Sequence, residues 1–163
     1  MTTPQPTGVL NRRPDGSDLF ITRDAHLPID ATWQWITHPD KTAAWVGAWR
    51  QGDGERRVDV HMAVEEAWAE MEVVACERPR QLRLVGVAPP AWDIGFELSP
   101  TAEGTKILFV HRGIDEAQLR DIGPGWEFYL DCLVAALTGA KAPAWDAYPL
   151  GQSAYYDRLS VAN

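Results

Sequence analysis

The chain has 163 residues, a length that favours one domain with a single hydrophobic core. Its formal charge is −8, from 15 basic and 23 acidic residues. This balance excludes the basic patch that a nucleic-acid surface or an anionic membrane face requires, so we expect no nucleic-acid partner and no membrane partner.

The sequence also limits where the protein works. It has no run of 18 apolar residues and no basic, apolar leader, so we expect neither a membrane span nor a signal peptide. Cys76 and Cys132 lie outside any Cys-x-x-Cys pattern, which is typical of two reduced thiols in a cytoplasmic protein.

The first part of the chain predicts a lead-in, one strand and two short helices. Residues 1–17 hold three prolines and two glycines, which indicates a flexible N-terminal lead-in. Side chains alternate between two faces over residues 18–27, as in a strand. Two short helices follow near residues 30–36 and 41–45, because Pro39 interrupts the helical pattern between them.

The middle of the chain predicts about six further strands with short turns. In five of these segments, residues 58–64, 69–75, 82–86, 92–98 and 107–112, apolar and polar side chains alternate with period two. Consecutive strands joined by short turns favour an antiparallel meander.

A long helix is predicted from Ile122 to Thr138. Its apolar residues recur at spacings of three and four, which places them on one stripe. Pro124 suits a first helical position, and Gly139 suits the residue just past the helix end. Strands in one run, followed by the major helix, predict an α+β domain.

The last segment, residues 140–163, contains four aromatic residues and is too aromatic for a tail that stays in solvent. Phe128 lies on the predicted long helix nearly opposite its apolar stripe. We expect the tail to pack on that face of its own domain, or to bridge to a second copy in a homodimer.

Three stretches carry a resemblance to a known family. They are Leu27 to Asp40 with residues 44–47; residues 73–84, including Glu77-Arg78-Pro79-Arg80-Gln81-Leu82; and residues 103–106, 111–113, 125–126 and 129–131. Their order over residues 18–139 resembles the SRPBCC (START and birch-pollen-allergen-like) superfamily, in particular the branch similar to the C-terminal domain of the activator of heat-shock-protein-90 ATPase.

The resemblance implies a helix-grip fold, in which a curved antiparallel β-sheet wraps around a long C-terminal α-helix, with two short helices after the first strand. It also implies the division of the chain into the lead-in, a domain at 18–139 and the tail. Relatives bind lipids, hormones or polyketides, and some catalyse cyclisation, so fold is implied more firmly than function.

Such a fold encloses a cavity between sheet and helix, and alternation along the strands selects its walls. The expected ligand-binding residues are Trp35, Trp45, Met71, Val73, Leu84, Trp92, Phe96, Phe109, His111, Trp126, Tyr129, Leu130 and Leu133. The alternative to a ligand-binding role is that these side chains only fill the hydrophobic core.

Polar residues with catalytic potential are few. His111 ends an apolar strand face, where it would orient a ligand, act as an acid–base group with Tyr129, or serve only as a structural hydrogen-bond partner. Glu70 and Glu72 fit a solvated face better than a catalytic pair. The four histidines lack metal-ligand spacing, and no nucleotide or phosphate loop occurs, so we expect no metal and no cofactor.

Three functions stay open from the sequence. The first is binding of a small hydrophobic molecule without catalysis. The second is an enzyme that acts on such a molecule with His111 as the acid–base group. The third is a ligand-free, co-chaperone-like module that contacts a partner protein through aromatic surface.

Overall fold

The computed structural model describes residues 4–63 and 67–161 and has an α+β architecture. Within this part of the chain, eight strands form one antiparallel sheet in the order β1-β2-β8-β7-β6-β5-β4-β3. The strands are β1 (Val9–Arg13), β2 (Gly16–Ala25), β3 (Gly47–Gln51), β4 (Arg57–Met62), β5 (Ala69–Glu77), β6 (Gln81–Gly86), β7 (Asp93–Thr101) and β8 (Gly104–Arg112). The helices are α1 (Ile29–Thr37), α2 (Pro39–Thr42), α3 (Leu119–Thr138) and α4 (Ala147–Val161), with a 3-10 turn η1 (Glu116–Gln118) before α3.

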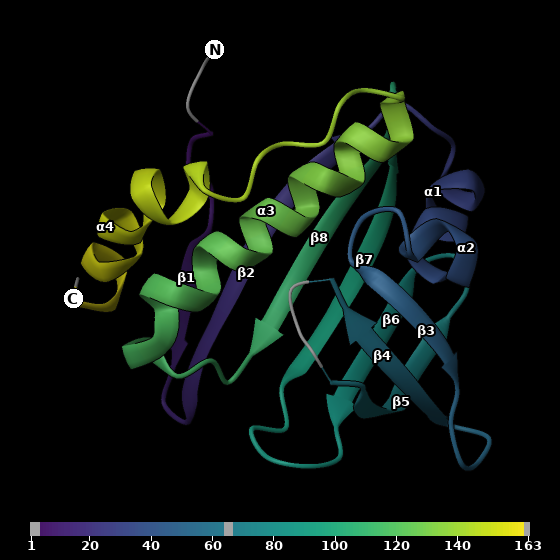
Figure 1. Cartoon of the computed structure of the whole chain (residues 1–163), viewed down its shortest axis with the longest axis horizontal. Coiled ribbons are helices and arrows are strands. Elements are labelled where there is room, and N and C mark those ends of the chain that lie inside the picture. The colour runs from purple at the N-terminus through teal and green to yellow at the C-terminus, as the bar shows by residue number, and fades with distance from the viewer. Residues whose placement is uncertain (1–3, 64–66, 162–163) are drawn as a thin grey trace.

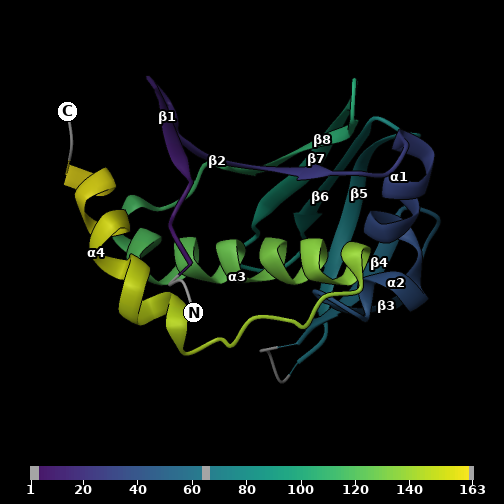
Figure 2. The same cartoon turned by 90° about the horizontal axis from the view of Figure 1, so that it is seen from above.

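The sheet curves around α3, which lies diagonally across one of its faces (Figure 1). Seen from above, α1 and α2 lie at one end of α3, and α4 lies beside the other end (Figure 2). The two short helices connect β2, which lies next to one edge of the sheet, to β3, which forms the opposite edge. This is the helix-grip fold that the sequence predicted. None of the helices in the described residues has the length and apolar character needed to cross a membrane.

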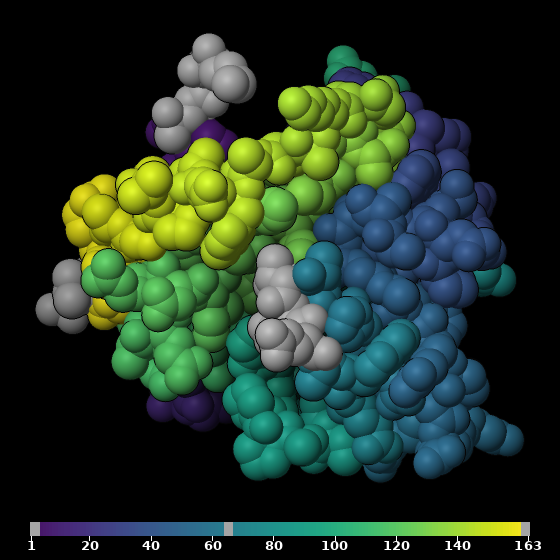
Figure 3. Space-filling model, in the orientation of Figure 1, coloured from purple at the N-terminus to yellow at the C-terminus, as the bar shows by residue number. Residues whose placement is uncertain are grey.

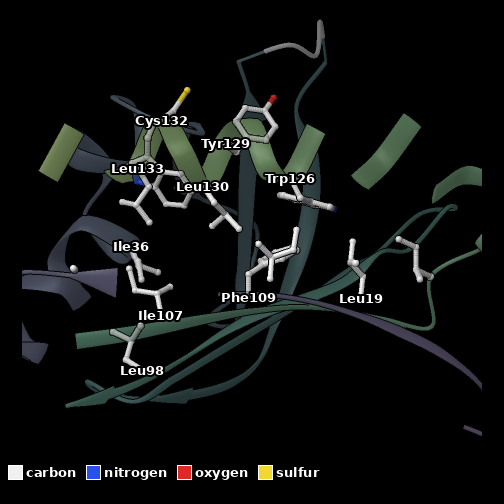
Figure 4. Packing of buried hydrophobic residues seen from close by; sticks show 14 of the residues in the cluster. Leu19, Ile36, Leu98, Ile107, Phe109, Trp126, Tyr129, Leu130, Cys132 and Leu133 are labelled. Atoms are coloured by element: carbon white, nitrogen blue, oxygen red, sulfur yellow. The ribbon is translucent and has the colours of Figure 1, made fainter. Parts of the chain in front are cut away.

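The core fills the space between α3 and the strands that it crosses. Trp126, Leu130 and Leu133 point from α3 toward the sheet, where Phe109 and Ile107 point back from β8 (Figure 4). The stripe predicted on the long helix is therefore its buried face. Burial of apolar side chains such as these contributes about 1.5–3 kcal/mol for each one removed from water.

The start of α3 differs from the prediction. The helix begins at Leu119, so Pro124 lies inside it and not at its first position. A proline inside a helix leaves the carbonyl four residues earlier without its usual donor. That carbonyl belongs to Arg120, and the Ser153 hydroxyl on α4 donates to it at 3.0 Å. The end agrees with the prediction, because Gly139 takes the left-handed conformation with φ 72°.

The N-terminal segment also differs from the expected flexible lead-in. Val9–Arg13 forms the edge strand β1 and pairs with β2 in an antiparallel register. The short, mostly polar run gave no clear alternation, so its backbone pairing was not visible in the sequence. Likewise, Gly47–Gln51 forms the opposite edge strand β3, where no alternating run was predicted.

Helix α4 packs along α3 within the same chain. The Phe128 ring lies with its centroid 5.3 Å from that of Trp145 and 5.2 Å from that of Tyr148. Tyr148 and Tyr156 are fully buried. Figure 3 shows α4 and the segment before it lying against α3 on the surface. The homodimer and the domain limits stay predictions.

Some predicted segments extend past the described residues. These are residues 1–3 of the lead-in, Val64 at the end of a predicted strand, and residues 162–163 of the tail.

Candidate functional site

An apolar pocket of about 260 Å³ lies between the β3–β7 half of the sheet, the α1–α2 region and Trp126 of α3. The strands line it with aliphatic, sulfur-containing and aromatic side chains from every member of this half. These are Trp49, Val58, Val60, Met62, Ala69, Met71, Val73, Cys76, Leu82, Leu84, Ile94 and Phe96. None of the described residues that line the pocket carries a charge.

Strand alternation explains most of this wall. Successive side chains in a strand point to opposite faces, so Val58, Val60 and Met62 of β4 share the pocket face. In β5 the register shifts between Val73 and Ala75. A bulge of this kind changes which parity faces inward, and Cys76 lines the pocket in place of Ala75.

The α1–α2 region closes one end of the pocket. Ile36 and Thr37 end α1, and Trp45 follows α2. The Trp45 indole N–H donates to the Trp35 carbonyl at 2.8 Å. The Trp49 indole N–H donates to the Thr37 carbonyl at 2.9 Å. These bonds fix both rings and leave neither donor for a ligand.

Gly47 is required where β3 joins this end. A Cβ at this position would lie 1.9 Å from the His61 carbonyl oxygen, and its φ of +144° lies in a region that favours glycine. The close approach of β3 to β4 at this point gives the pocket its outer wall.

Trp126 forms the wall on the α3 side and belongs to an aromatic cluster. Its ring centroid lies 4.5 Å from that of Phe109 and 5.8 Å from that of Trp92. Its indole N–H donates to His111 Nδ1 at 3.1 Å. Phe96 joins the cluster to the pocket end, with its centroid 6.0 Å from that of Trp45.

The pocket offers a ligand almost no free hydrogen-bond donor. The Thr37 hydroxyl donates to the Trp33 carbonyl at 2.8 Å, and the Thr42 hydroxyl donates to the Pro39 carbonyl at 3.2 Å. The three lining indoles are bonded within the protein as well. A polar ligand group that loses its hydrating water in this pocket would gain few hydrogen bonds in return. The pocket therefore favours ligands with an apolar surface.

The structure separates the thirteen predicted ligand residues into two groups. The residues that line the apolar pocket are Trp45, Met71, Val73, Leu84, Phe96 and Trp126. Outside its lining lie Trp35, Trp92, Phe109, His111, Tyr129, Leu130 and Leu133.

Each residue of the second group has another place. Phe109, Leu130 and Leu133 fill the core between α3 and β8. Figure 4 shows Tyr129 on the side of α3 that faces away from Phe109. The Lys41 ammonium lies 4.4 Å from the centroid of the Trp35 ring. The stripe period of a helix predicts burial, but it does not say which buried residues border a void.

Sequence reasoning missed residues of two kinds. The β4 residues and Ile94 carry the same alternation signal as the residues that were chosen, so the pattern already contained them. Thr42, Val46 and Trp49 lie near turns and in β3, where no periodicity marks them.

His111 and Trp92 border a separate cleft near the start of β7 and the end of β8. His111 itself is 2% exposed. Burial lowers the pKa of the His111 imidazole from its usual 6.5 to about 4. The ring is therefore neutral near pH 7. Within residues 4–63 and 67–161, no group of three or more His, Cys, Asp or Glu side chains is placed to hold a metal ion.

A family model described as "Activator of Hsp90 ATPase homolog 1-like protein" matches residues 26–138. None of the curated proteins compared with the chain by sequence matches it.

Several solved structures share the fold. CalU16 from Micromonospora echinospora aligns with a TM-score of 0.76 and 22% identity over 97% of this chain and 98% of its own. The protein encoded by gene BPP1335 from Bordetella parapertussis has a TM-score of 0.72 and 25% identity over 97% of this chain and 95% of its own. DynU16, "a putative protein in the dynemicin biosynthetic locus", has a TM-score of 0.67 and 19% identity over 78% of this chain and 49% of its own.

Proposed function

The chain belongs to the Activator of Hsp90 ATPase homolog 1-like family, and on that premise we propose that it binds a small, mostly apolar or aromatic molecule in the pocket between the sheet and α3. The observation that carries this proposal is the uncharged lining, in which the indole and hydroxyl donors are already bonded to the protein. Displacing water from such a surface is favourable without any polar match.

The volume of the pocket bounds the ligand. Ligand sites commonly measure about 300–1,000 Å³, so a pocket of about 260 Å³ is small. An apolar cavity of about 150 Å³ holds benzene. A molecule of two fused or linked rings is therefore the size that we expect. Met62 and Met71 let the walls adapt, because a thioether side chain repacks easily.

The enzyme hypothesis has less support. Neither His111 nor Tyr129 lines the apolar pocket. The lowered pKa of His111 also keeps it from exchanging protons near neutral pH, where a general acid–base group works best.

Adjacent valines in β5 provide a matched test of the binding proposal. Val73 lines the pocket, whereas Val74 is 39% exposed on the other face. We expect Val73→Phe to fill part of the pocket and weaken binding of the fluorescent probe N-phenyl-1-naphthylamine at least tenfold. Val74→Phe should bind the probe as the wild type does.

The measurement is a fluorescence titration, with the unfolding temperature of each variant as a check of folding. Displacement of the probe by naphthalene would show that a two-ring molecule is sufficient. A wild-type protein that binds neither compound, or equal probe affinity in the two valine variants, would contradict the proposal.

A further inference from the structure

A second cleft of about 260 Å³ lies at the ends of β7 and β8 and beside the start of α3. His111 lines this cleft, and Trp126, which donates a hydrogen bond to the His111 ring, lines the apolar pocket. The two hollows have no lining residue in common. The other residues that line the second cleft include Trp92, Arg112, Gln118 and Ile122.

The hydrogen bond from Trp126 determines where the His111 proton lies. An indole N–H can only donate, so His111 Nδ1 must be the unprotonated nitrogen that accepts from it. In a neutral imidazole the other nitrogen, Nε2, then carries the hydrogen. The Trp92 ring, with its centroid 5.2 Å from that of His111, holds the imidazole from another side.

Among the described residues, His111 makes only the hydrogen bond at Nδ1, so Nε2–H has no protein acceptor although the residue is 2% exposed. Nε2 is not one of the fully buried atoms without a partner, so it keeps some access to solvent, where a bound water or a ligand can accept from it. His111 therefore presents a positioned, uncharged donor to the cleft.

The carboxylates near this donor are already engaged. The Arg83 guanidinium holds Asp93 through two hydrogen bonds of 2.8 and 2.6 Å. Asp115 accepts from the Ala117 backbone N–H at 3.0 Å. By contrast, Arg112 Nη1 is buried without a hydrogen bond, 3.9 Å from the nearest Asp93 oxygen. Both Asp93 oxygens and one Asp115 oxygen are thus hydrogen-bonded within the protein, and Arg112 Nη1 is a buried donor without an acceptor.

We propose that this cleft is a second binding site, which takes a small planar molecule through a carbonyl or carboxylate oxygen that accepts a hydrogen bond from His111 Nε2. The half-buried Trp92 and Ile122 supply the apolar surface for the plane of the molecule. The site is distinct from the apolar pocket and does not depend on what that pocket binds.

Nuclear magnetic resonance of the full chain tests the proposal. Benzamide and benzoate are the probes, and toluene is the control of similar shape that lacks an acceptor. We expect benzamide or benzoate to shift the His111 Nε2 signal and, across the hydrogen bond, the Trp126 indole N–H signal. The tighter of the two probes shows whether the oxygen belongs to a neutral carbonyl or a carboxylate.

Two variants separate the donor from the structural role of the ring. In His111→Asn the side-chain oxygen reaches about as far as Nδ1, which keeps the Trp126 acceptor but removes the Nε2 donor. In His111→Gln the longer amide restores a donor near Nε2 but loses the acceptor. We expect His111→Asn to bind the better probe about tenfold more weakly, the loss of one hydrogen bond, and His111→Gln to retain binding.

The proposal fails if neither benzamide nor benzoate moves the His111 signal up to its solubility limit, because a bound water alone then satisfies Nε2. It also fails if toluene shifts the signal equally, or if His111→Asn binds the probe as tightly as the wild type. If one of the His111 variants does not fold, the comparison of benzamide, benzoate and toluene on the wild-type protein still tests the proposal. The methyl signals of Met62 and Met71 report binding in the apolar pocket. Absence of binding in that pocket is therefore distinguished from absence of binding in the cleft at His111.

Discussion

A single buried side chain, His111, shows how its surroundings set its chemistry. It lies between the Trp92 and Trp126 rings and accepts a hydrogen bond from Trp126. Burial disfavours the charged imidazolium, and protonation of Nδ1 would also remove the acceptor that Trp126 uses. The residue is thus a neutral hydrogen-bonding group near pH 7, and its protonation opposes folding.

This gives a pH dependence with a definite sign. The folded pKa of His111 is about 4 and the usual value is 6.5, so between these pH values the unfolded chain binds more protons. Stability is fully present above pH 6.5 and falls as the pH drops toward 4, by at most roughly 3 kcal/mol from this group. We expect the stability of His111→Asn to change less than that of the wild type over this interval.

The measurement is urea unfolding at several pH values between 7 and 4. Other groups, such as Asp18, whose pKa the Arg13 hydrogen bonds lower, contribute equally to both proteins. The difference between the two curves therefore isolates His111. Parallel curves would show that the histidine is not held neutral by the fold.

At the scale of elements, the contact between α3 and α4 depends on one glycine. A Cβ added at Gly123 would lie 2.5 Å from the Tyr156 ring carbons Cγ and Cδ1. At Gly125, two residues further along the same helix, such a Cβ would have no atom within 4 Å. Glycine weakens a helix interior by about 1 kcal/mol relative to alanine, so only the close approach of α4 justifies Gly123.

Alanine substitutions at these two glycines should therefore have opposite signs. We expect Gly123→Ala to lower the free energy of unfolding by about 1–3 kcal/mol, because the Tyr156 ring must move. Gly125→Ala should raise it by up to about 1 kcal/mol.

Chemical unfolding of both variants measures the effect. In a chain that ends at Gly139, α4 is gone and Gly123→Ala should become stabilising. A penalty at Gly123 that persists in the shortened chain would mean that α4 is not its cause.

At the scale of the whole molecule, Glu127 joins segments that are far apart in the sequence. Its carboxylate accepts from the Gly8 backbone N–H at 2.8 Å and the Tyr156 hydroxyl at 2.6 Å, and it pairs with Arg23 at 2.6 Å. Burial alone would raise the pKa of Glu127, but hydrogen bonds from Tyr156, Arg23 and Thr7 bring it below its usual value. The residue is fully buried, so one charge holds the N-terminal segment, β2, α3 and α4 together.

Removing this carboxylate should be far more costly than removing an exposed one between the same helices. We expect Glu127→Ala to destabilise the protein by about 3–5 kcal/mol, because it leaves the buried Arg23 charge and several donors without a partner. Asp157→Ala removes the exposed Arg120–Asp157 pair, at 2.9 Å, and should cost less than about 1 kcal/mol.

Thermal and urea unfolding of the two variants provide the comparison. Equal small effects would mean that the Glu127 network contributes little to holding the four segments together.

The resemblance of three sequence stretches indicated the family, and the pattern of the sequence by itself determined the α+β class, the long helix and the face that most strands present. The class, the helix and the strand faces follow from local periodicity, which does not depend on where the residues lie in the fold. Six of the thirteen predicted ligand residues line the apolar pocket for the same reason, since the strands that supply most of them alternate as expected.

Only the tertiary structure decided which buried residues border a void and which fill the core. Leu130 and Phe96 both look buried in the pattern, yet only Phe96 reaches the pocket, because α3 covers one half of the sheet and leaves the other to α1 and α2. Cys76 lines the pocket through a register shift that periodicity does not contain. The Glu127 network depends on contacts across more than a hundred residues, and such distances are set by packing and not by any local pattern.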